Sequence, residues 1–517
     1  MVLAKKTSED PRFSFHWRCH ITKTTHLCFA DDLILFGGGS FQAASVLHEA
    51  LDTFTTHSGL QPNRSKSSVF IAGENEELQN SICDLFGFAK GDLPVKYLGV
   101  PLITTKLSSD DCKILVERIV ARIHNWTSKS LSYAGRLQLI QSVLFSLQVH
   151  WTSVFILPKR IIKDVEQVLR RFLWKGSEHD HKGAKVAWEA ITCPKSEGGL
   201  GLKKLEIWNK ACMAKHIWNI CQPTTTSSWA AWAKLNLLRN KSFWDASMPS
   251  ICSWTWRKLL NLRSTIRQFI KHIIGNGRDT FLWFDFWLPI GPIHSHFGNR
   301  DGDRVIYDSG LPRYARVADI INGENWHWPV ANSPDLIILK NSIPNSLVPR
   351  PTIKDGVIWQ ASPSGHFSIK DAYKNLVPIG NKVDWHKLVW YPHFIPKASF
   401  ILWLAIKGRL GTQDRLHITS SNPKCLLCNT QMETHNHLFF TCPVSRSIWD
   451  TVLHKCHDTY HNIPWEEYIP WLANHWRGKS FNTTIKRICL ASTVYIIWAE
   501  KFPISHQQLS GHQFYSN

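Results

Sequence analysis

Apolar and polar residues alternate along residues 26–36 on both sides of a pair of aspartates, Asp31 and Asp32. The apolar positions on the two sides are Leu27, Phe29, Leu33 and Leu35. A period of two residues is typical of a β-strand. Two such runs around a short polar turn predict a β-hairpin with both carboxylates at its tip.

Other stretches repeat their apolar residues with the 3.6-residue period of an amphipathic helix. We predict helices over residues 41–57, 109–126, 133–155 and 158–174, from residue 205 onward, and around residues 485–499. Residues 158–174 carry one apolar stripe, formed by Ile161, Val165, Val168 and Phe172. Short strands are predicted at residues 69–71 and 96–101.

Four further stretches are interpreted from their composition. Residues 138–158 contain no Lys, Arg, Asp or Glu, but their glutamines and His150 make them too polar for a membrane helix, so we expect a buried helix and no membrane partner. Residues 281–289 are rich in Trp and Phe and are expected in the core. Residues 288–313 and 342–352 are rich in Pro, Gly and polar residues and are expected to be linkers.

Composition and charge indicate the class of partner. The chain has 517 residues, enough for roughly three domains. The net charge of +20 favours polyanions, so RNA and DNA are the expected partners. The 25 Trp and 26 Phe residues add stacking surfaces for bases. A merely basic protein without such a partner is the alternative interpretation.

The cysteine pattern indicates a reducing environment. Ten of the 13 cysteines are scattered, and the polar N-terminus lacks the apolar core of a signal peptide. We therefore expect an intracellular, reducing location, which includes the nucleus.

The remaining three cysteines form a compact pattern with a histidine. Cys425 and Cys428 form a Cys-x-x-Cys pair, and His437 and Cys442 follow with four residues between them. This spacing is typical of a tetrahedral zinc site, and four protein ligands leave no open position, so the zinc is expected to be structural. Free thiols are the alternative interpretation. His435 is a rival third ligand, although an exposed histidine is the preferred interpretation at that position.

Chemistry at the Asp31–Asp32 tip is a separate hypothesis. Paired aspartates can hold Mg²⁺ against phosphate oxygens in two-metal phosphoryl transfer. Aspartate is also a favoured turn residue in its own right, so an Asp-Asp turn alone does not decide between the two interpretations.

The helix predicted over residues 158–174 offers a basic surface. Arg160, Lys163, Arg170 and Arg171 lie around its apolar stripe and are candidates for phosphate contacts. An ordinary amphipathic helix with a solvated basic face is the alternative. The Gly275-Asn276-Gly277 segment lacks the Gly-Lys-Ser/Thr continuation of a phosphate loop, and its Asn-Gly pair favours a hairpin turn.

Several of these motifs together resemble the reverse transcriptase of plant non-LTR (LINE-type) retrotransposons. The resemblance is carried by Phe29-Ala30-Asp31-Asp32, by Gly59-Leu60 with Asn63 and Lys66-Ser67, and by Tyr97-Leu98-Gly99-Val100. It implies that Asp31 and Asp32 bind the catalytic Mg²⁺ ions of the polymerase palm. It also places Lys66 near the incoming nucleotide, whereas a solvated loop lysine is the alternative for that residue.

The resemblance also includes a departure. The family's palm has a third metal-binding aspartate on an earlier strand, but before the hairpin this sequence has only Asp10, in a turn-like setting. We therefore expect the fingers and the first palm strand to be missing, and no polymerase activity from this chain alone. A ribonuclease H domain is not expected in the short polar stretch that ends the sequence.

The C-terminal part resembles the zinc-binding domain that follows reverse transcriptase in plant LINE-type elements. The shared motifs include Gly365-His366-Phe367-Ser368, Trp403-Leu404-Ala405, the four zinc ligands and Ile448-Trp449. Trp390, Trp403 and Trp449 are interpreted as core around the metal. Lys397, Lys407, Arg409 and Arg415 are further candidates for phosphate contacts.

Together these features predict an α+β fold with five regions. The regions are the C-terminal part of a palm, made of a β-hairpin, a helix and short strands (1–105), a helical thumb-like region (106–180), a mixed connecting region of unknown role (181–350), a small, mostly helical zinc-binding domain (351–455), and a C-terminal helix and tail (456–517). The first functional hypothesis is a catalytically incomplete fragment of a retrotransposon RNA-directed DNA polymerase. The second is a non-catalytic, zinc-containing nucleic-acid-binding protein. A zinc-dependent enzyme is disfavoured because all four ligands come from the protein.

Overall fold

The computed structural model describes residues 6–7, 9–73, 75–103, 105–127, 131–175, 184–329, 333–415, 423–459 and 463–511, with side chains of the last helix described through Lys501. The fold is α+β, predominantly helical with a few small sheets, as predicted. Two compact units interleave along the chain. The first consists of residues 1–107, 154–156 and 210–375, and the second of residues 108–153, 157–209 and 376–517. The five predicted regions stay predictions.

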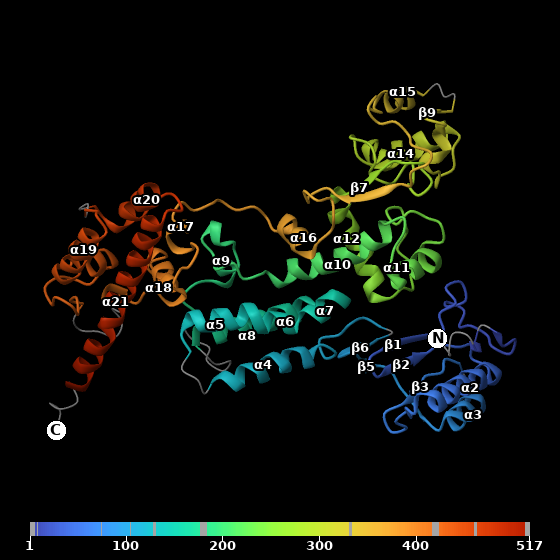
Figure 1. The fold of residues 1–517 in the computed structure, drawn as a ribbon, viewed down its shortest axis with the longest axis horizontal. Coiled ribbons are helices and arrows are strands. Elements are labelled where there is room, and N and C mark those ends of the chain that lie inside the picture. Colours follow the sequence, from blue (N-terminus) through green and yellow to red (C-terminus); the bar gives the residue numbers. More distant parts are fainter. Residues whose placement is uncertain are drawn as a thin grey trace. The chain divides into compact units, whose positions relative to one another are not determined.

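The first unit begins with small sheets and two helices (Figure 1, blue). Its elements in this part are β1 (His26–Phe29), β2 (Asp32–Leu35), α2 (Phe41–Ser58), β3 (Ser68–Val69), α3 (Glu76–Phe86), β4 (Ala89–Lys90), β5 (Val95–Tyr97) and β6 (Val100–Leu102). β1 and β2 form the predicted antiparallel hairpin, with Phe29 opposite Asp32. The strand predicted over residues 96–101 is instead a second hairpin, β5–β6. It turns at Leu98 and Gly99, whose positive φ angles of 50° and 81° reverse the chain.

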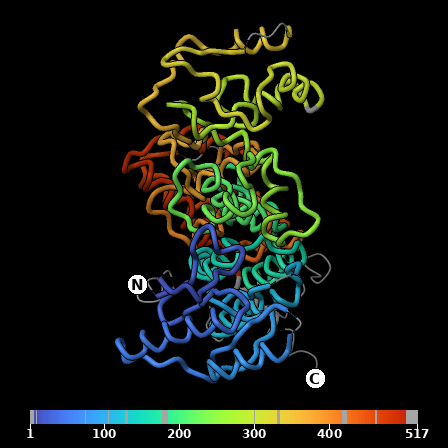
Figure 2. The backbone as a smooth tube through the Cα atoms, turned by 90° about the vertical axis from the view of Figure 1, so that its right-hand side faces the viewer, coloured from blue at the N-terminus to red at the C-terminus, as the bar shows by residue number. Residues whose placement is uncertain are grey.

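Helix α2 starts and ends where local hydrogen bonds allow it. The Ser40 side chain accepts a hydrogen bond from the backbone N–H of Ala43, and Gly59 ends the helix in the left-handed conformation, with φ of 71°. Its buried residues Val46 and Leu47 pack with Phe13, which precedes the hairpin. This small core holds the hairpin's flanking segment against the helix, and Figure 2 shows the same blue region from the side.

The rest of the first unit contains short helices and two further small sheets. The elements are α10 (Leu205–Cys221, which begins in the second unit), α11 (Ser228–Ala233), α12 (Trp254–Ile266), β7 (Ile270–Ile273), α13 (Ile293–His296), α14 (Gly298–Ser309), β8 (Ile321–Asn322), β9 (Asn325–Trp326), α15 (Pro334–Asn341), β10 (Gly356–Trp359) and α16 (Ile369–Leu376). Residues 281–289 lie largely in the core, as predicted, with Trp283 and Trp287 buried. The linker prediction for residues 288–313 was wrong, because α13 and α14 lie there with Ile293 and Val305 fully buried.

The Gly275–Gly277 segment is a loop closed on a buried carboxylate. The Oδ1 atom of Asp355 accepts hydrogen bonds from the N–H groups of Gly275 and Gly277, each at 2.8 Å, and its Oδ2 atom accepts from Asp279 N–H and the Thr280 hydroxyl. A Cβ atom on Gly275 would lie 2.3 Å from the carbonyl oxygen of Ile353, so only glycine fits there. The expected Asn-Gly hairpin was wrong, because β7 pairs with the distant strand β10.

The second unit is a helical assembly. Its helices are α4 (Lys113–Thr127), α5 (Tyr133–Leu139), α6 (Phe145–Leu147), α7 (Val149–Val154), α8 (Lys159–Lys175), α9 (Trp188–Ile191), α17 (His386–Val389), α18 (Pro396–Ile406), α19 (Pro443–Lys455), α20 (Trp465–His475) and α21 (Phe481–Gly511). A π-helical segment, Ile140–Leu144, joins α5 to α6, so the predicted helix 133–155 is a nearly continuous rod with a local irregularity. In α8 all four residues of the predicted stripe are buried.

The core of the second unit forms around α18. Residues Ala398–Ala405 of this helix are all buried, and a helix that is apolar on every side belongs in a protein interior. Phe400 stacks on Tyr133 of α5 with ring centroids 5.6 Å apart, and Trp403 donates its indole N–H to the carbonyl of Gly198 at 3.0 Å. Trp403 and Trp449 are buried as expected, whereas Trp390 is half-buried, with the Lys195 ammonium 4.7 Å from its ring centroid.

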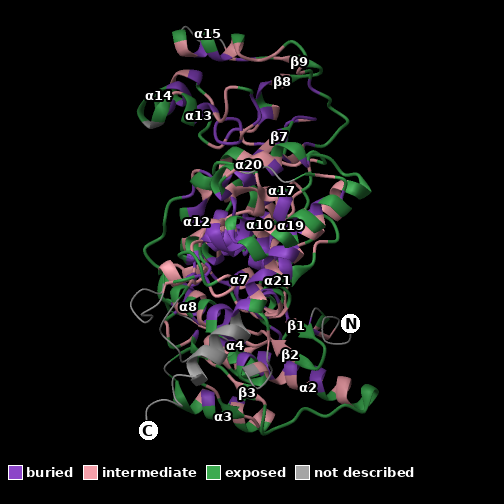
Figure 3. Ribbon diagram, turned by 90° about the vertical axis from the view of Figure 1, so that its left-hand side faces the viewer, coloured by how far each residue is buried: buried purple, intermediate pink, exposed green. Residues whose placement is uncertain are grey.

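The helices differ in how much of their surface is buried. Figure 3 shows many buried residues in α10, whereas α2, α3 and α14 carry both buried and exposed residues. Among the described residues, no helix is long and apolar enough to cross a membrane.

Candidate metal centre

Four side chains of the second unit converge on one point. The ligand atoms of Cys425, Cys428, His437 and Cys442 all lie within 4.8 Å of one another. The Sγ atoms of Cys425 and Cys442 are 4.0 Å apart, and Cys428 Sγ lies 3.2 Å from His437 Nε2. Among the described residues this is the only group of three or more Cys, His, Asp or Glu side chains arranged so closely.

A tight loop presents the first two thiols. The N–H of Cys425 donates to the carbonyl of Gln431 at 2.7 Å, and the N–H of Asn429 donates back to the carbonyl of Cys425 at 2.8 Å. Asn429 closes the loop with a positive φ of 56°, a conformation that asparagine tolerates better than most residues. The short spacing therefore turns both Cys-x-x-Cys thiols toward the same side.

The other two donors flank a π-helical segment. His437 begins this segment, His437–Thr441, and its Nδ1 atom lies 3.3 Å from the Thr441 hydroxyl, so that Nε2 faces Cys428. Cys442 follows as the residue before α19, and Pro443 takes the first helical position. Both donors are therefore fixed by the backbone on either side of this segment.

This donor set fits a zinc ion. Two thiolates bound to one tetrahedral zinc lie about 3.8 Å apart, given zinc–sulfur distances of about 2.3 Å. The 4.0 Å between Cys425 and Cys442 is close to that value. Three of the four residues are buried, and the set of three sulfur atoms and one nitrogen is complete without a water. The arrangement therefore suits a structural metal.

The two thiols of the loop differ in their acidity without a metal. Burial raises the pKa of Cys425 to about 12. Burial acts in the same direction on Cys428, but hydrogen bonds with Thr430 and His437 outweigh it and lower the pKa of that thiol to about 5. A bound cation would stabilise both thiolates, since metal binding displaces thiol protons.

A buried carboxylate ties the metal-site loop to the rest of the domain. Glu433 is fully buried, and its side chain accepts hydrogen bonds from the N–H groups of Gln413 at 2.9 Å and Leu426 at 3.3 Å. It also forms an ion pair with the buried ammonium of Lys501 on α21, which donates a second hydrogen bond to the carbonyl of Gly411 at 2.8 Å. The sequence interpretation missed both residues, since nothing in the sequence links two charges 68 positions apart.

The rival ligand His435 lies outside the cluster. Its Nδ1 atom is 3.4 Å from the Thr412 hydroxyl, and its ring packs against Phe439. Burial, reinforced by the charge of Arg415, lowers the pKa of His435 to about 4. The expected exposure of this histidine was wrong, because its side chain is a neutral part of the core.

The residues predicted for polymerase chemistry are all exposed in the first unit. Asp31 lies in the turn of the β1–β2 hairpin and Asp32 begins β2, and both are exposed. Tyr97 is close enough to Asp32 for that charge to add to the effect of burial, and both raise the tyrosine's pKa. Lys66 is exposed in a turn held by the Asn63 side chain and forms no ion pair with either aspartate. Among the described residues, no third acidic, cysteine or histidine side chain completes a metal-binding group with them.

The basic candidates on α8 lie on the solvent side of that helix. Arg160, Lys163 and Arg170 are exposed, opposite the buried apolar stripe. Arg171 is half-buried and already has an interaction partner. The solvent side of the helix is therefore rich in cations, to which the exposed Lys159 and Lys175 at its ends also contribute.

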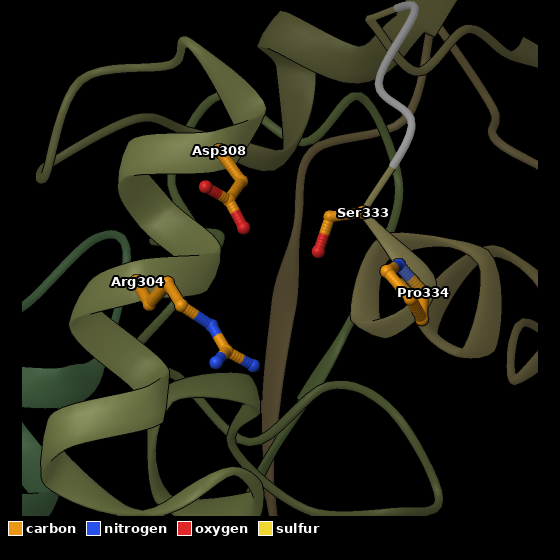
Figure 4. Close-up of a pocket in the computed structure, with 4 residues that line it drawn as sticks. All are labelled: Arg304, Asp308, Ser333 and Pro334. Carbon is orange, nitrogen blue, oxygen red and sulfur yellow. The ribbon is translucent and has the colours of Figure 1, made fainter.

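One cavity of the first unit offers no comparable chemistry. It has a volume of about 500 Å³ and is lined by Arg304 and Asp308 of α14 and by Ser333 and Pro334 at the start of α15 (Figure 4). The Arg304 guanidinium is already paired with Asp335 and Asp301. No predicted site residue lines this cavity.

Comparison with known proteins places the cysteine cluster inside a recognised domain. Residues 367–449 match the domain family described as zinc-binding in reverse transcriptase. This stretch contains all four converging side chains.

Two proteins of Arabidopsis thaliana resemble the chain over longer stretches. One, named provisionally as a ribonuclease H protein, is 28% identical over 378 residues, which cover 68% of this chain and 58% of that protein. The other, an uncharacterized mitochondrial protein, is 30% identical over 160 residues, which cover 29% of this chain and 99% of that protein. The chain thus spans 58% of the length of the first relative.

The Glu433–Lys501 ion pair generates a prediction about stability. Lys501→Met removes the cation and leaves a buried carboxylate unpaired, which typically costs about 3–5 kcal/mol in the free energy of unfolding. We expect chemical denaturation to show a loss of that order, and the double variant Glu433→Gln/Lys501→Met to recover most of it. Lys479→Met, at an exposed position, is the matched control. A Lys501→Met protein as stable as this control would contradict the role given to the pair.

Proposed function

Since this chain belongs to the family of retrotransposon-derived, reverse-transcriptase-related proteins, we propose that it binds RNA and DNA without catalysing a reaction. We further propose that one structural zinc ion stabilises its zinc-binding domain. The observation that carries the proposal is the convergence of three cysteines and one histidine within the matched residues.

In this proposal the zinc ligands are Cys425, Cys428, His437 and Cys442. Four protein donors saturate tetrahedral zinc, so the ion supplies folding energy and has no position for a substrate. His437 is held by Thr441 and the Cys-x-x-Cys loop by Glu433, and such partners orient metal ligands. A zinc-dependent enzyme is disfavoured on the same ground.

The nucleic-acid partner is supported by charge. The chain carries a net charge of +20, and the exposed face of α8 concentrates part of it on one rigid element. Cations on a helix contact phosphates without reading sequence, so this surface suits binding to an RNA or DNA backbone. Arg409 and Arg415 are exposed in the zinc-binding domain and extend the set of phosphate-contact candidates.

For the β1–β2 hairpin we infer descent from a LINE-type (non-LTR) RNA-directed DNA polymerase without retained activity. Two-metal phosphoryl transfer needs several carboxylates converging on the ions. Asp31 and Asp32 are exposed and have no third such partner among the described residues.

We also propose an intracellular, reducing location for the protein, and the nucleus is one such compartment. It is supported by the thirteen cysteines, none of which forms a disulfide bond in the structure.

The zinc assignment predicts a metal content that depends on the four ligands. The purified chain is expected to contain one zinc ion, and Cys425→Ser or His437→Gln to lose most of it, as measured by native mass spectrometry and elemental analysis. His435→Gln, two residues from a proposed ligand, should retain the ion and serves as the control. Full zinc content in the Cys425→Ser protein would overturn the assignment.

The inferred lack of polymerase activity predicts that the chain does not extend a primer. The zinc-loaded chain with Mg²⁺, nucleotides and a primed RNA template is expected to give no primer extension under conditions in which an active reverse transcriptase does. Extension that is abolished by Asp31→Ala would show that the hairpin is catalytic and would refute the non-catalytic proposal.

The α8 surface predicts a change in salt dependence. Replacing Arg160, Lys163 and Arg170 together by Gln should reduce the slope of log affinity against log salt for duplex DNA by about 0.9 for each phosphate that the variant no longer neutralises. The measurement is fluorescence anisotropy over a range of salt concentrations. Lys455→Gln, at an exposed position of α19, is the single-charge control. An unchanged slope in the triple variant would remove α8 from the interface.

A further inference from the structure

A second cavity of the first unit lies between two segments that are distant in the sequence. Its volume is about 450 Å³, and its lining consists of Trp17, Ile21, Leu235, Asn236, Arg239 and Asn240. The indole N–H of Trp232 donates to the carbonyl of Arg18 at 2.8 Å and so fixes the early segment against α11. The two walls are therefore held together by the fold.

The apolar part of the lining is unusually exposed. Trp17 is 67% exposed, and Ile21 and Leu235 are exposed as well. A large aromatic side chain is normally at least partly covered, since burial of its surface stabilises the fold. Three exposed apolar side chains around one cavity form a platform on which a flat ligand can stack.

The two segments that form the cavity carry basic but no acidic residues. Neither residues 11–30 nor residues 207–244, which supply the two walls, contain Asp or Glu. The Arg18 guanidinium carbon lies 4.5 Å from the centroid of the Trp17 ring, and Arg239 is exposed at the other wall. Neither guanidinium forms an ion pair with a described carboxylate, so both are available to an anion.

The backbone of the second wall is irregular at the cavity. A π-helical segment, Lys234–Leu238, ends in Arg239 and Asn240, whose φ angles are 48° and 65°. Consecutive left-handed residues other than glycine are uncommon, and such conformations cluster at ligand-binding positions. Segments of π-helix show the same tendency. This irregular end places a guanidinium and an amide side by side at the cavity.

We propose that this cavity binds an unpaired base of single-stranded nucleic acid. The base stacks on Trp17, Arg18 and Arg239 contact the flanking phosphates, and the amides of Asn236 and Asn240 meet the base edge. Stacking on aromatic side chains between cations is the general way in which proteins hold single strands. A duplex keeps its bases stacked and paired, so it cannot offer a base face to the indole. The inference rests on the proposed nucleic-acid-binding function but not on the α8 surface.

The test compares single strands and a duplex on the zinc-loaded full chain. Fluorescence anisotropy with labelled uridine and thymidine homopolymers and with a DNA duplex gives three affinities at one salt concentration. Trp17→Ala is expected to weaken binding of single strands by about 5- to 100-fold and to leave the duplex affinity unchanged. Trp17→Phe should retain most of the single-strand affinity. Tyr307→Ala removes another exposed aromatic ring, one that does not line the cavity, and is the matched control.

The outcomes separate this proposal from the proposed function. A loss confined to one homopolymer supports the site and assigns it to RNA or to DNA, and a loss with both supports a site that accepts either. Single-strand affinity that is unchanged in a folded Trp17→Ala protein overturns the site while the α8 proposal stands. Failure to bind any of the three ligands overturns both. Photocrosslinking of a thiouridine oligomer should map to residues 12–25 or 232–241, and crosslinks found only elsewhere would also refute the site.

Discussion

The fully buried carboxylate of Glu433 imposes the constraint on which the zinc-binding domain depends. A charge with no exposed surface is tolerated only where the protein supplies the hydrogen bonds and the counter-charge that water would otherwise provide. Glu433 obtains them from the Cys-x-x-Cys loop, from the turn at Gln413 and from Lys501 on the last helix. One side chain therefore fixes the positions of three segments, and with them the geometry in which four metal donors meet.

In the first unit, the buried carboxylate of Asp355 also organises a loop through its hydrogen bonds. Asp355 fills the loop at Gly275 and Gly277 with its carboxylate, where an external anion would otherwise fit against the backbone N–H groups. The loop thus resembles a phosphate-binding loop in composition, but its N–H groups already donate hydrogen bonds to Asp355. Each unit therefore contains an irregular loop that is rigid because a buried acid completes its hydrogen bonds, and neither acid is a candidate for catalysis.

The proposed binding surfaces lie where such internal compensation is lacking. The face of α8 is cationic and solvent-exposed, and the cavity at Trp17 combines exposed apolar surface with unpaired guanidinium groups. Asp31 and Asp32 are also exposed, and no third metal-binding side chain joins them among the described residues. These two surfaces are the basis of the proposal that the protein binds nucleic acid.

The sequence alone determined the features that depend on local pattern. The alternation around Asp31 predicted the hairpin, and the apolar stripe predicted α8. The Cys-x-x-Cys spacing predicted the four side chains that converge in the structure. Each of these patterns lies within a short stretch of the sequence. Tertiary structure alone decided the rest. The pairing of β7 with β10, the fit of Asp355 into the Gly275 loop, the ion pair of Glu433 with Lys501 and the cavity between Trp17 and Arg239 all join segments from tens to hundreds of residues apart. Such contacts leave no periodicity in the sequence, since they are fixed by packing and by the need of buried charges for partners.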